Sequence, residues 1–283
     1  SSEGLIRHAD KSTMKLDIYD FERPIGIQIF GHNIESMREA AEICDRAKPE
    51  FIDINYGCPV KKVANKGAGA GILKDLPKMV AMTKEIVEAT NIPVTVKTRL
   101  GWDDNTKYIV DVAERLQDVG IQALSIHGRT RKQMYKGEAD WTLIGAVKNN
   151  QRMQIPIFGN GDIDSPEKAL LYKDTYGVDG IMIGRASIGY PWIFNEIKAY
   201  LADGSHLPPP TFKERVEAVE EHLNFSIQWK GEKVGIAEMK RHYGNYFKGI
   251  PHFKEYKSGL ILANERQEVE HLLGEIKQQF LVS

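Results

Sequence analysis

One thiol in the sequence is placed where a side chain could do chemistry. Cys58 stands in the run Asp53-Ile54-Asn55-Tyr56-Gly57-Cys58-Pro59, at the end of an apolar stretch of strand length. A cysteine between Gly and Pro is positioned by backbone geometry and not by packing alone. We interpret Cys58 as the catalytic residue. The alternative is a small buried residue in a turn, since free cysteine is among the most buried residue types.

Polar side chains also follow the other short apolar stretches. Lys97 closes one of them, and an interior lysine is costly unless it meets an anion or an electron-rich ring, such as a reduced flavin. A solvated lysine at a strand end is the alternative. Gln28 could bind the edge of a flavin or a uracil. His127 could be a ligand, a proton donor or a structural group.

Two glycine-containing turns could hold a phosphate. They are Gly159-Asn160-Gly161-Asp162 and Gly184-Arg185-Ala186. Glycines let backbone N–H groups approach phosphate oxygens, and Arg185 adds further donors. Ordinary β/α turn chemistry is the alternative. The stretch 67–71 lacks the phosphate-loop pattern and is interpreted as a flexible segment that could act as a lid beside Cys58.

Short apolar strands alternate with helices over about 190 residues, which leaves a doubly wound sheet or a (β/α)8 barrel. A barrel collects the ends of all its strands at one mouth, whereas an open sheet binds mainly at its switch point. Chemistry-bearing residues follow every strand here, which favours the α/β TIM barrel. The six expected strands lie at 25–30, 51–54, 93–97, 123–126, 155–158 and 180–183. Because six strands do not close a barrel, we expect two more to precede residue 1.

A proline-rich linker ends the alternating pattern, so we expect a barrel domain at residues 1–203 and an all-helical domain at 204–283. The second domain combines lysines with aromatic residues, a composition that could bind unpaired bases. The alternative is a solvated helix face whose aromatic residues form the core. The aromatic residues are Tyr243, Tyr246, Phe247, Phe253 and Tyr256. A second basic group lies on the barrel loops: Lys61, Lys62, Lys66, Arg99, Arg129, Arg131, Lys132 and Lys136.

The composition excludes several classes of protein. The chain has 283 residues, 42% of them hydrophobic and 27% charged, as in globular proteins. Its net charge of −1 predicts no general attraction to nucleic acid, so any basic surface must be local. With only two cysteines, Cys44 and Cys58, a disulfide framework is not expected and a reducing compartment is. No apolar run is long enough to span a membrane, and no Cys/His spacing fits a zinc site.

Five motifs together resemble the tRNA-dihydrouridine synthases, most closely the bacterial B type. They are Asn55-Tyr56-Gly57-Cys58-Pro59, Val96-Lys97-Thr98-Arg99-Leu100-Gly101, His127-Gly128-Arg129-Thr130, Gly159-Asn160-Gly161-Asp162-Ile163 and Gly184-Arg185-Ala186. The resemblance implies an FMN-binding (β/α)8 barrel followed by a helical tRNA-binding domain. It also implies a cytoplasmic protein, a monomer with no obligate protein partner and no metal.

The reaction implied by this resemblance is reduction of the C5–C6 double bond of a tRNA uridine. NADPH would reduce FMN, the flavin would pass hydride to uracil C6, and Cys58 would donate a proton to C5. Asn55 would orient the uracil, with Arg99, Arg129 and Lys132 on the substrate side. The residues implied to contact FMN are Gln28, Lys97 and His127 at the ring and Asn160, Gly161, Asp162, Gly184 and Arg185 at the phosphate end.

The chain departs from the family pattern at its start. The family opens with a strand ending in Ala-Pro-Met and then a second strand, and neither occurs here. We therefore expect an N-terminally incomplete chain that binds FMN poorly. Two other functions stay open at this point: an FMN barrel oxidoreductase acting on a free pyrimidine, and a non-catalytic RNA-binding barrel protein.

Overall fold

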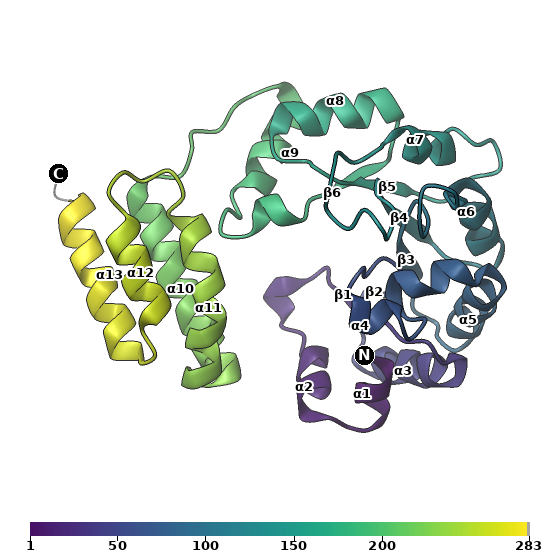
Figure 1. Ribbon diagram of the computed structural model, residues 1–283, viewed down its shortest axis with the longest axis horizontal. Helices are drawn as coiled ribbons and strands as arrows, with labels where there is room; N and C mark the ends of the chain where they lie inside the picture. Colours follow the sequence, from purple (N-terminus) through teal and green to yellow (C-terminus); the bar gives the residue numbers. More distant parts are fainter. Residues whose placement is uncertain (282–283) are drawn as a thin grey trace. The chain divides into compact units, whose positions relative to one another are not determined.

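A six-stranded parallel sheet organises the first part of the chain. The computed structural model describes residues 1–281. The strands are β1 (Gly26–Ile29), β2 (Phe51–Asn55), β3 (Val94–Arg99), β4 (Ala123–His127), β5 (Ile157–Asn160) and β6 (Gly180–Met182), and they lie side by side in chain order (Figure 1). A doubly wound sheet would reverse this order at its switch point. The uninterrupted order is that of a barrel, which confirms the expected fold class, with β1 and β6 as the two edges within residues 1–281.

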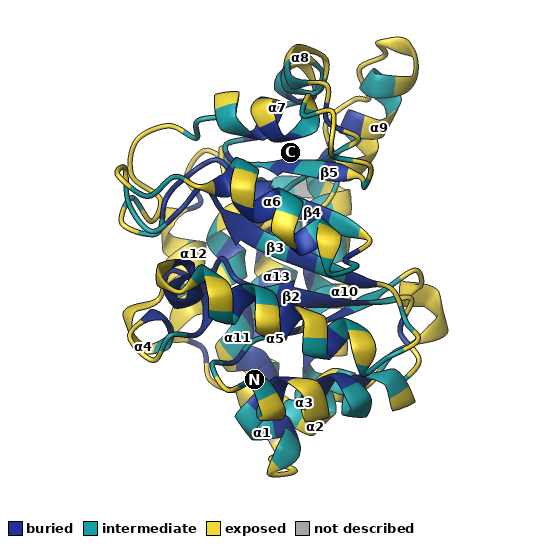
Figure 2. Ribbon diagram, turned by 90° about the vertical axis from the view of Figure 1, so that its right-hand side faces the viewer, coloured by how far each residue is buried: buried dark blue, intermediate teal, exposed yellow. Residues whose placement is uncertain are grey.

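Helices between the strands cover one face of this sheet. They are α3 (Ile34–Arg46), α5 (Leu76–Glu88), α6 (Ile109–Asp118), α7 (Thr142–Lys148) and α8 (Pro166–Tyr176). Side-chain caps begin two of these helices: the Asn33 side chain accepts a hydrogen bond from Ser36 N at 2.8 Å, and Asp75 accepts one from Lys78 N at 3.1 Å. Figure 2 shows the helices buried toward the strands and exposed on their outer surface.

The two faces of the sheet differ in chemistry because side chains alternate along each strand. The helix-covered face is apolar and buried: Ile27, Ile29, Ile52, Ile54, Val94, Val96, Leu124, Ile126 and Ile157. The other face carries polar residues in rows that the strand register defines. One row aligns Gln28, Asp53 and Thr95; the next aligns Asn55, Lys97 and Ser125; the third aligns Arg99, His127 and Asn160. The register alone therefore brings most of the predicted site residues together.

Short helices form both before β1 and in the glycine-rich stretch 67–71, which was expected to be flexible. Residues before β1 form α1 (Ser2–Ile6), α2 (Asp10–Thr13) and two 3-10 turns, η1 (Met14–Leu16) and η2 (Asp20–Glu22), and α1 packs on α3. The glycine-rich stretch follows the short helix α4 (Lys61–Ala64) and enters the 3-10 helix η3 (Gly69–Lys74), whose first five residues are buried. The lid interpretation of this stretch is wrong, because its small residues pack inside the protein.

Contacts divide the chain into two compact units. The first comprises residues 1–163 and 168–183, and the second comprises 164–167 and 184–283. The second contains η4 (Arg185–Ser187), α9 (Ile193–Asp203), α10 (Phe212–Lys230), α11 (Glu232–Tyr246), α12 (Lys254–Leu262) and α13 (Arg266–Leu281). Thr211 begins α10 with a capping box to Glu214. The domain boundary expected after residue 203 stays a prediction.

The aromatic residues of the helical unit form its core. Tyr243, Tyr246, Phe247 and Phe253 are at most 6% exposed and pack with the apolar faces of α10, α11 and α13. Tyr256 is partly buried against the same cluster. The interpretation that the four buried rings stack on unpaired bases is wrong, because their faces are already covered by neighbouring side chains.

We predict that Gly159→Ala destabilises the first unit. A Cβ at this position would lie 1.9 Å from the Trp141 ring, and the ring cannot move away freely because its Nε1 donates to Gly161 O at 3.0 Å. Overpacking of this kind costs about 1–3 kcal/mol of unfolding free energy. Chemical denaturation measures it, with Gly274→Ala as the control, since a Cβ there meets open space. Equal stability of Gly159→Ala and the wild type would contradict this packing.

Candidate active site

The peptide that precedes Cys58 is held at both ends. Arg99 Nε donates to Gly57 O at 2.7 Å, while the Asn55 Oδ1 accepts from Gly57 N at 2.9 Å and from Cys58 N at 3.0 Å. The Cys58 carbonyl accepts from Ala70 N at 3.0 Å. Because these bonds fix the backbone on both sides of Cα, the half-buried thiol is held in one place.

The backbone of Gly69 packs closely against Cys58. Its φ of +53° is a conformation that favours glycine, and a Cβ would lie 2.8 Å from Cys58 Cβ and 3.0 Å from Cys58 O. The glycine-rich stretch therefore supports the Cys58 loop through close backbone approach. The sequence signal for this role was present, since glycine marks close approach as well as flexibility.

Gln28 is hydrogen-bonded on one side to Asn55 and on the other to the Asp53 carboxylate. Asn55 Nδ2 donates to Gln28 Oε1 at 2.7 Å, and Gln28 Nε2 donates to Asp53 Oδ2 at 2.6 Å. Thr95 Oγ1 donates to the other oxygen of Asp53 at 2.7 Å. Sequence reasoning missed Asp53, although a carboxylate in the middle of the apolar strand Phe51-Ile52-Asp53-Ile54 was a visible signal.

Lys97 brings a positive charge to the same polar face. It pairs in register with Asn55 and is largely buried. Burial lowers the pKa of its ammonium, and the nearby Arg99 cation lowers it further, while Asp53 opposes the shift. The ammonium makes no hydrogen bond or ion pair with any described residue. A buried ammonium left in this state is suited to an anionic or electron-rich ligand.

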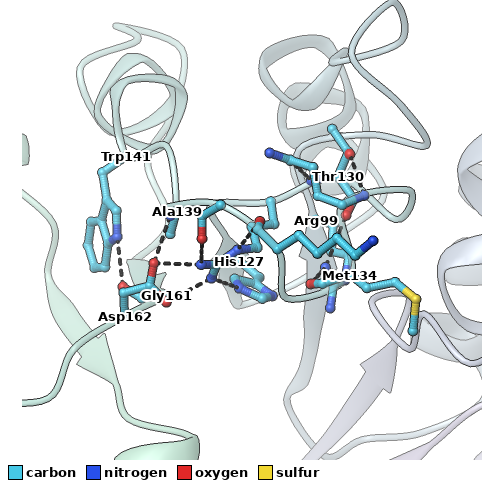
Figure 3. A network of polar contacts seen from close by, with 12 residues as sticks. Arg99, His127, Thr130, Met134, Ala139, Trp141, Gly161 and Asp162 are labelled. Carbon is cyan, nitrogen blue, oxygen red and sulfur yellow. Dashed lines mark hydrogen bonds and ion pairs between the residues drawn. The ribbon is translucent and has the colours of Figure 1, made fainter.

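Arg99, at the end of β3, links the loop after β2 to the loop after β4 from inside the protein (Figure 3). Its guanidinium is 2% exposed and donates to Gly57 O, to Thr130 O at 3.1 Å and to Met134 O at 2.9 Å. Burial lowers the pKa of Arg99 to about 10, so the group stays charged at neutral pH. The structure thus places this predicted substrate residue on backbone carbonyls, where it supports the Cys58 loop.

Arg129 and Asp162 form a buried, two-pronged ion pair. Arg129 Nη1 and Nη2 donate to Asp162 Oδ1 and Oδ2 at 2.8 and 2.7 Å, and Ala139 N donates to Oδ2 at 2.8 Å (Figure 3). Arg129 is only 2% exposed. The Asp162 carboxylate is therefore neutralised inside the protein, and a phosphate at this turn would meet its backbone N–H groups instead.

His127 is neutral and its tautomer is fixed. Burial, together with the cations of Arg99, Lys97 and Arg129, lowers its pKa to about 3. Its Nε2 lies 3.3 Å from Arg129 Nη1. Because a guanidinium can only donate, Nε2 accepts and the ring proton sits on Nδ1.

The remaining predicted cofactor residues lie at the end of β5, in the turn after it and at the start of η4. Asn160 Nδ2 donates to Met182 O at 2.7 Å. Gly161 has φ +133°, and a Cβ there would lie 2.5 Å from Ala139 Cβ and 3.2 Å from His127 Cδ2. Gly184 and Arg185 begin η4 in the second unit.

Lys132 is the most exposed of the predicted substrate residues on the first unit. Its ammonium lies 2.8 Å from an Asp103 carboxylate oxygen. Among residues 1–281, no group of three His, Cys, Asp or Glu side chains is arranged to hold a metal ion. In the same part of the chain, no helix combines the length and the apolar character needed to cross a membrane.

We predict that Arg99→Met frees the Cys58 loop. The change leaves three carbonyls without their charged donor, which should cost about 3 kcal/mol of unfolding free energy. Chemical denaturation and the rate of Cys58 alkylation by iodoacetamide measure the two effects. Arg99→Lys is the matched control, since it keeps the charge and should fall between wild type and Arg99→Met. Wild-type alkylation in the folded Arg99→Met variant would contradict the clamp.

We predict that His127 makes the fold less stable below neutral pH. Its folded pKa of about 3 lies below the unfolded value near 6.5, so the unfolded state binds the extra proton and stability falls as pH drops below 6.5. The loss should be about 2 kcal/mol between pH 7.5 and pH 5. Urea denaturation at both pH values checks this, and His127→Gln should show a smaller loss. The same pH dependence in both proteins would contradict a neutral, buried His127.

Comparison with known proteins assigns this arrangement to a family. The family model described as "Dihydrouridine synthase (Dus)" matches residues 1–281. The tRNA-dihydrouridine synthase B of Pseudomonas putida is 42% identical over 258 residues, which cover 91% of this chain and 76% of that protein. The probable tRNA-dihydrouridine synthase 1 of Synechocystis sp. is 39% identical over 270 residues, covering 95% and 75%. On these matches, the chain belongs to the dihydrouridine synthase family.

Proposed function

We propose that this protein reduces the C5–C6 double bond of specific uridines in tRNA to give 5,6-dihydrouridine, with FMN as its cofactor. The single observation that carries the proposal is the fixed thiol of Cys58 at the edge of a polar sheet face. Its neighbours Asn55 and Lys97 share one register row. Family membership supplies the reaction class, and the relatives named above are tRNA-modifying enzymes by name.

The polar face fits a flavin. The Lys97 ammonium makes no bond to any described residue, and it would stabilise negative charge at the N1–O2 edge of a reduced flavin ring. Gln28 and Asn55 each use one amide hydrogen internally and keep a second one for a ligand. Neutral His127 could donate from Nδ1. At the phosphate end, the proposed donors are backbone N–H groups of Asn160, Gly161 and Asp162, while the assignment of Gly184 and Arg185 to the cofactor stays a prediction from the family resemblance.

Cys58 and Asn55 would act on the uracil. FMN, when bound and reduced by NADPH, supplies the hydride that uracil C6 accepts. Cys58 Sγ gives the proton that C5 receives, so one hydride and one proton saturate the double bond. Asn55 orients the base, and its bonds to Gly57 N and Cys58 N couple the place of the base to the place of the thiol.

Exposed lysines beside the site would contact tRNA phosphates. Lys61, Lys62 and Lys66 follow Cys58 directly, and Lys136 lies on the loop after β4. Lys132 is the further candidate on that loop, whereas Arg99 and Arg129 would act on substrate only through the loops they hold. The uridine must leave its stack to reach Cys58, which costs a few kcal/mol that phosphate contacts would offset.

We propose a cytoplasmic monomer without an obligate protein partner.

We predict that Cys58→Ala abolishes dihydrouridine formation. The gene carrying this change should fail to restore dihydrouridine to tRNA of a strain lacking its own copy, because alanine lacks the proton that Cys58 is proposed to give to C5. Mass spectrometric mapping of tRNA measures this and identifies the modified position. Cys44→Ala is the matched control, since Cys44 is fully buried and burial raises its pKa to about 11.

The outcomes separate the competing functions. Dihydrouridine formation by Cys58→Ala would refute the assigned role of the thiol. Turnover of a free pyrimidine without any change in tRNA would favour a small-molecule oxidoreductase. Absence of flavin absorbance near about 450 nm in the purified full-length protein would refute the cofactor, and faster anaerobic bleaching by NADPH than by NADH would support the proposed reductant.

A further inference from the structure

We propose that Asp53 is a positioning residue for Cys58, acting through a one-way hydrogen-bond chain that runs through Gln28 and Asn55. The inference deepens the proposed function and rests on it only where catalysis is measured. Asp53 lies on β2, two residues before Asn55, so both side chains point to the polar face of the sheet. The Asp53 carboxylate accepts hydrogen bonds from Gln28 and Thr95, and its link to Cys58 is indirect.

The chain links the carboxylate to the Cys58 backbone in three steps. Asp53 Oδ2 accepts from Gln28 Nε2 at 2.6 Å, and Gln28 Oε1 accepts from Asn55 Nδ2 at 2.7 Å. Asn55 Oδ1 then accepts from both Gly57 N and Cys58 N, at 2.9 and 3.0 Å. The link to the carboxylate is slightly shorter than the usual N–H···O range of about 2.7–3.2 Å, and the other links lie within that range.

Both ends of the chain fix the direction of every link. Backbone N–H groups can only donate, so the Asn55 oxygen must face them and its NH2 must face Gln28. Gln28 must then present its oxygen to Asn55 and its NH2 to Asp53. An ionised carboxylate can only accept, so it completes the sequence without a conflict. No amide in the chain can flip without placing two donors or two acceptors against each other.

This role requires the ionised form of Asp53, which its hydrogen-bond donors favour and its burial disfavours. It is 9% exposed between the fully buried Ile52 and Ile54 on the opposite face. Burial raises its pKa, while hydrogen bonds from Gln28 and Thr95 and the charge of Lys97 oppose that rise. The Thr95 hydroxyl donates at 2.7 Å to the oxygen that Gln28 does not use. The carboxylate therefore has donors on both oxygens from neighbouring strands.

An amide at position 53 would no longer fix which group donates and which accepts in each link of the hydrogen-bond chain. Asp53→Asn keeps the size of the side chain but offers NH2 as well as oxygen. Once its NH2 faces Gln28, the glutamine turns its oxygen toward it and its NH2 toward Asn55, where two donors meet. The Asn55 amide then loses its support, and the peptide before Cys58 keeps only the Arg99 bond to Gly57 O.

The test measures Cys58 itself in four variants. Iodoacetamide alkylation of Cys58 is followed by mass spectrometry, with thermal unfolding by circular dichroism and the kcat and KM for tRNA as further measurements. We expect Asp53→Asn to alkylate about fivefold faster than wild type, the factor that corresponds to loss of one hydrogen bond of about 1 kcal/mol. We expect kcat to fall with little change in KM.

Thr95→Val is the matched control for stability. It removes one hydrogen bond from the same carboxylate and leaves the chain to Cys58 intact, so its Tm should fall as in Asp53→Asn while alkylation stays near wild type. Asn55→Ala removes the last link. Adding Asp53→Asn to Asn55→Ala should then cause no further change in alkylation, because Asp53 acts only through Asn55.

Two results would overturn the proposal: wild-type alkylation in folded Asp53→Asn, or full additivity with Asn55→Ala. If Asp53→Asn does not fold, Gln28→Met interrupts the chain at its middle and decides the matter by the same alkylation rate. Alkylation needs neither flavin nor tRNA. A protein that passes this test but forms no dihydrouridine would refute the proposed function alone.

Discussion

The Gly57–Cys58 peptide is the point on which the candidate site depends. Its carbonyl is bound by a buried arginine from β3 and its N–H by an asparagine from β2. A cysteine side chain has one rotatable bond before sulfur, so a fixed backbone leaves the thiol few positions. Preorganisation of this kind is what a reacting group on a loop requires, because a displacement of about 1 Å can cost a large factor in rate.

The site also concentrates positive charge that is balanced mostly by neutral groups. Arg99 is bound by carbonyl oxygens, and Arg129 by Asp162. Lys97 has no such partner among the described residues. The neutral state of His127 follows from its burial and then from this surplus, since a further cation beside three others would be unfavourable. An anionic group entering the polar face would therefore meet an existing field and would not have to reorganise it.

Sequence reasoning predicted the parts of the fold that follow from local patterns. The six strands could be predicted from the apolar runs. The collection of polar side chains at the carboxyl ends of the strands could be predicted from the residues that follow those runs. The roles of Arg99 and Arg129 could not be predicted, because they depend on which backbone atoms and carboxylates the fold brings within reach. A buried arginine and a surface arginine look alike in a sequence. The interpretation of the aromatic residues in the helical unit was wrong for the same reason, since basic and aromatic residues can share a helix while facing opposite ways.

The polar rows also specify how the sheet is assembled. A slip of one residue between β2 and β3 would exchange the two faces of β3, placing Lys97 among the isoleucines under the helices and exposing Val96. Burying an unpaired ammonium there would cost far more than the strand pairing returns. The residues proposed to handle flavin and uracil thus exclude misregistered sheets during folding, so a variant that loses them could gain alternative pairings as well as lose chemistry.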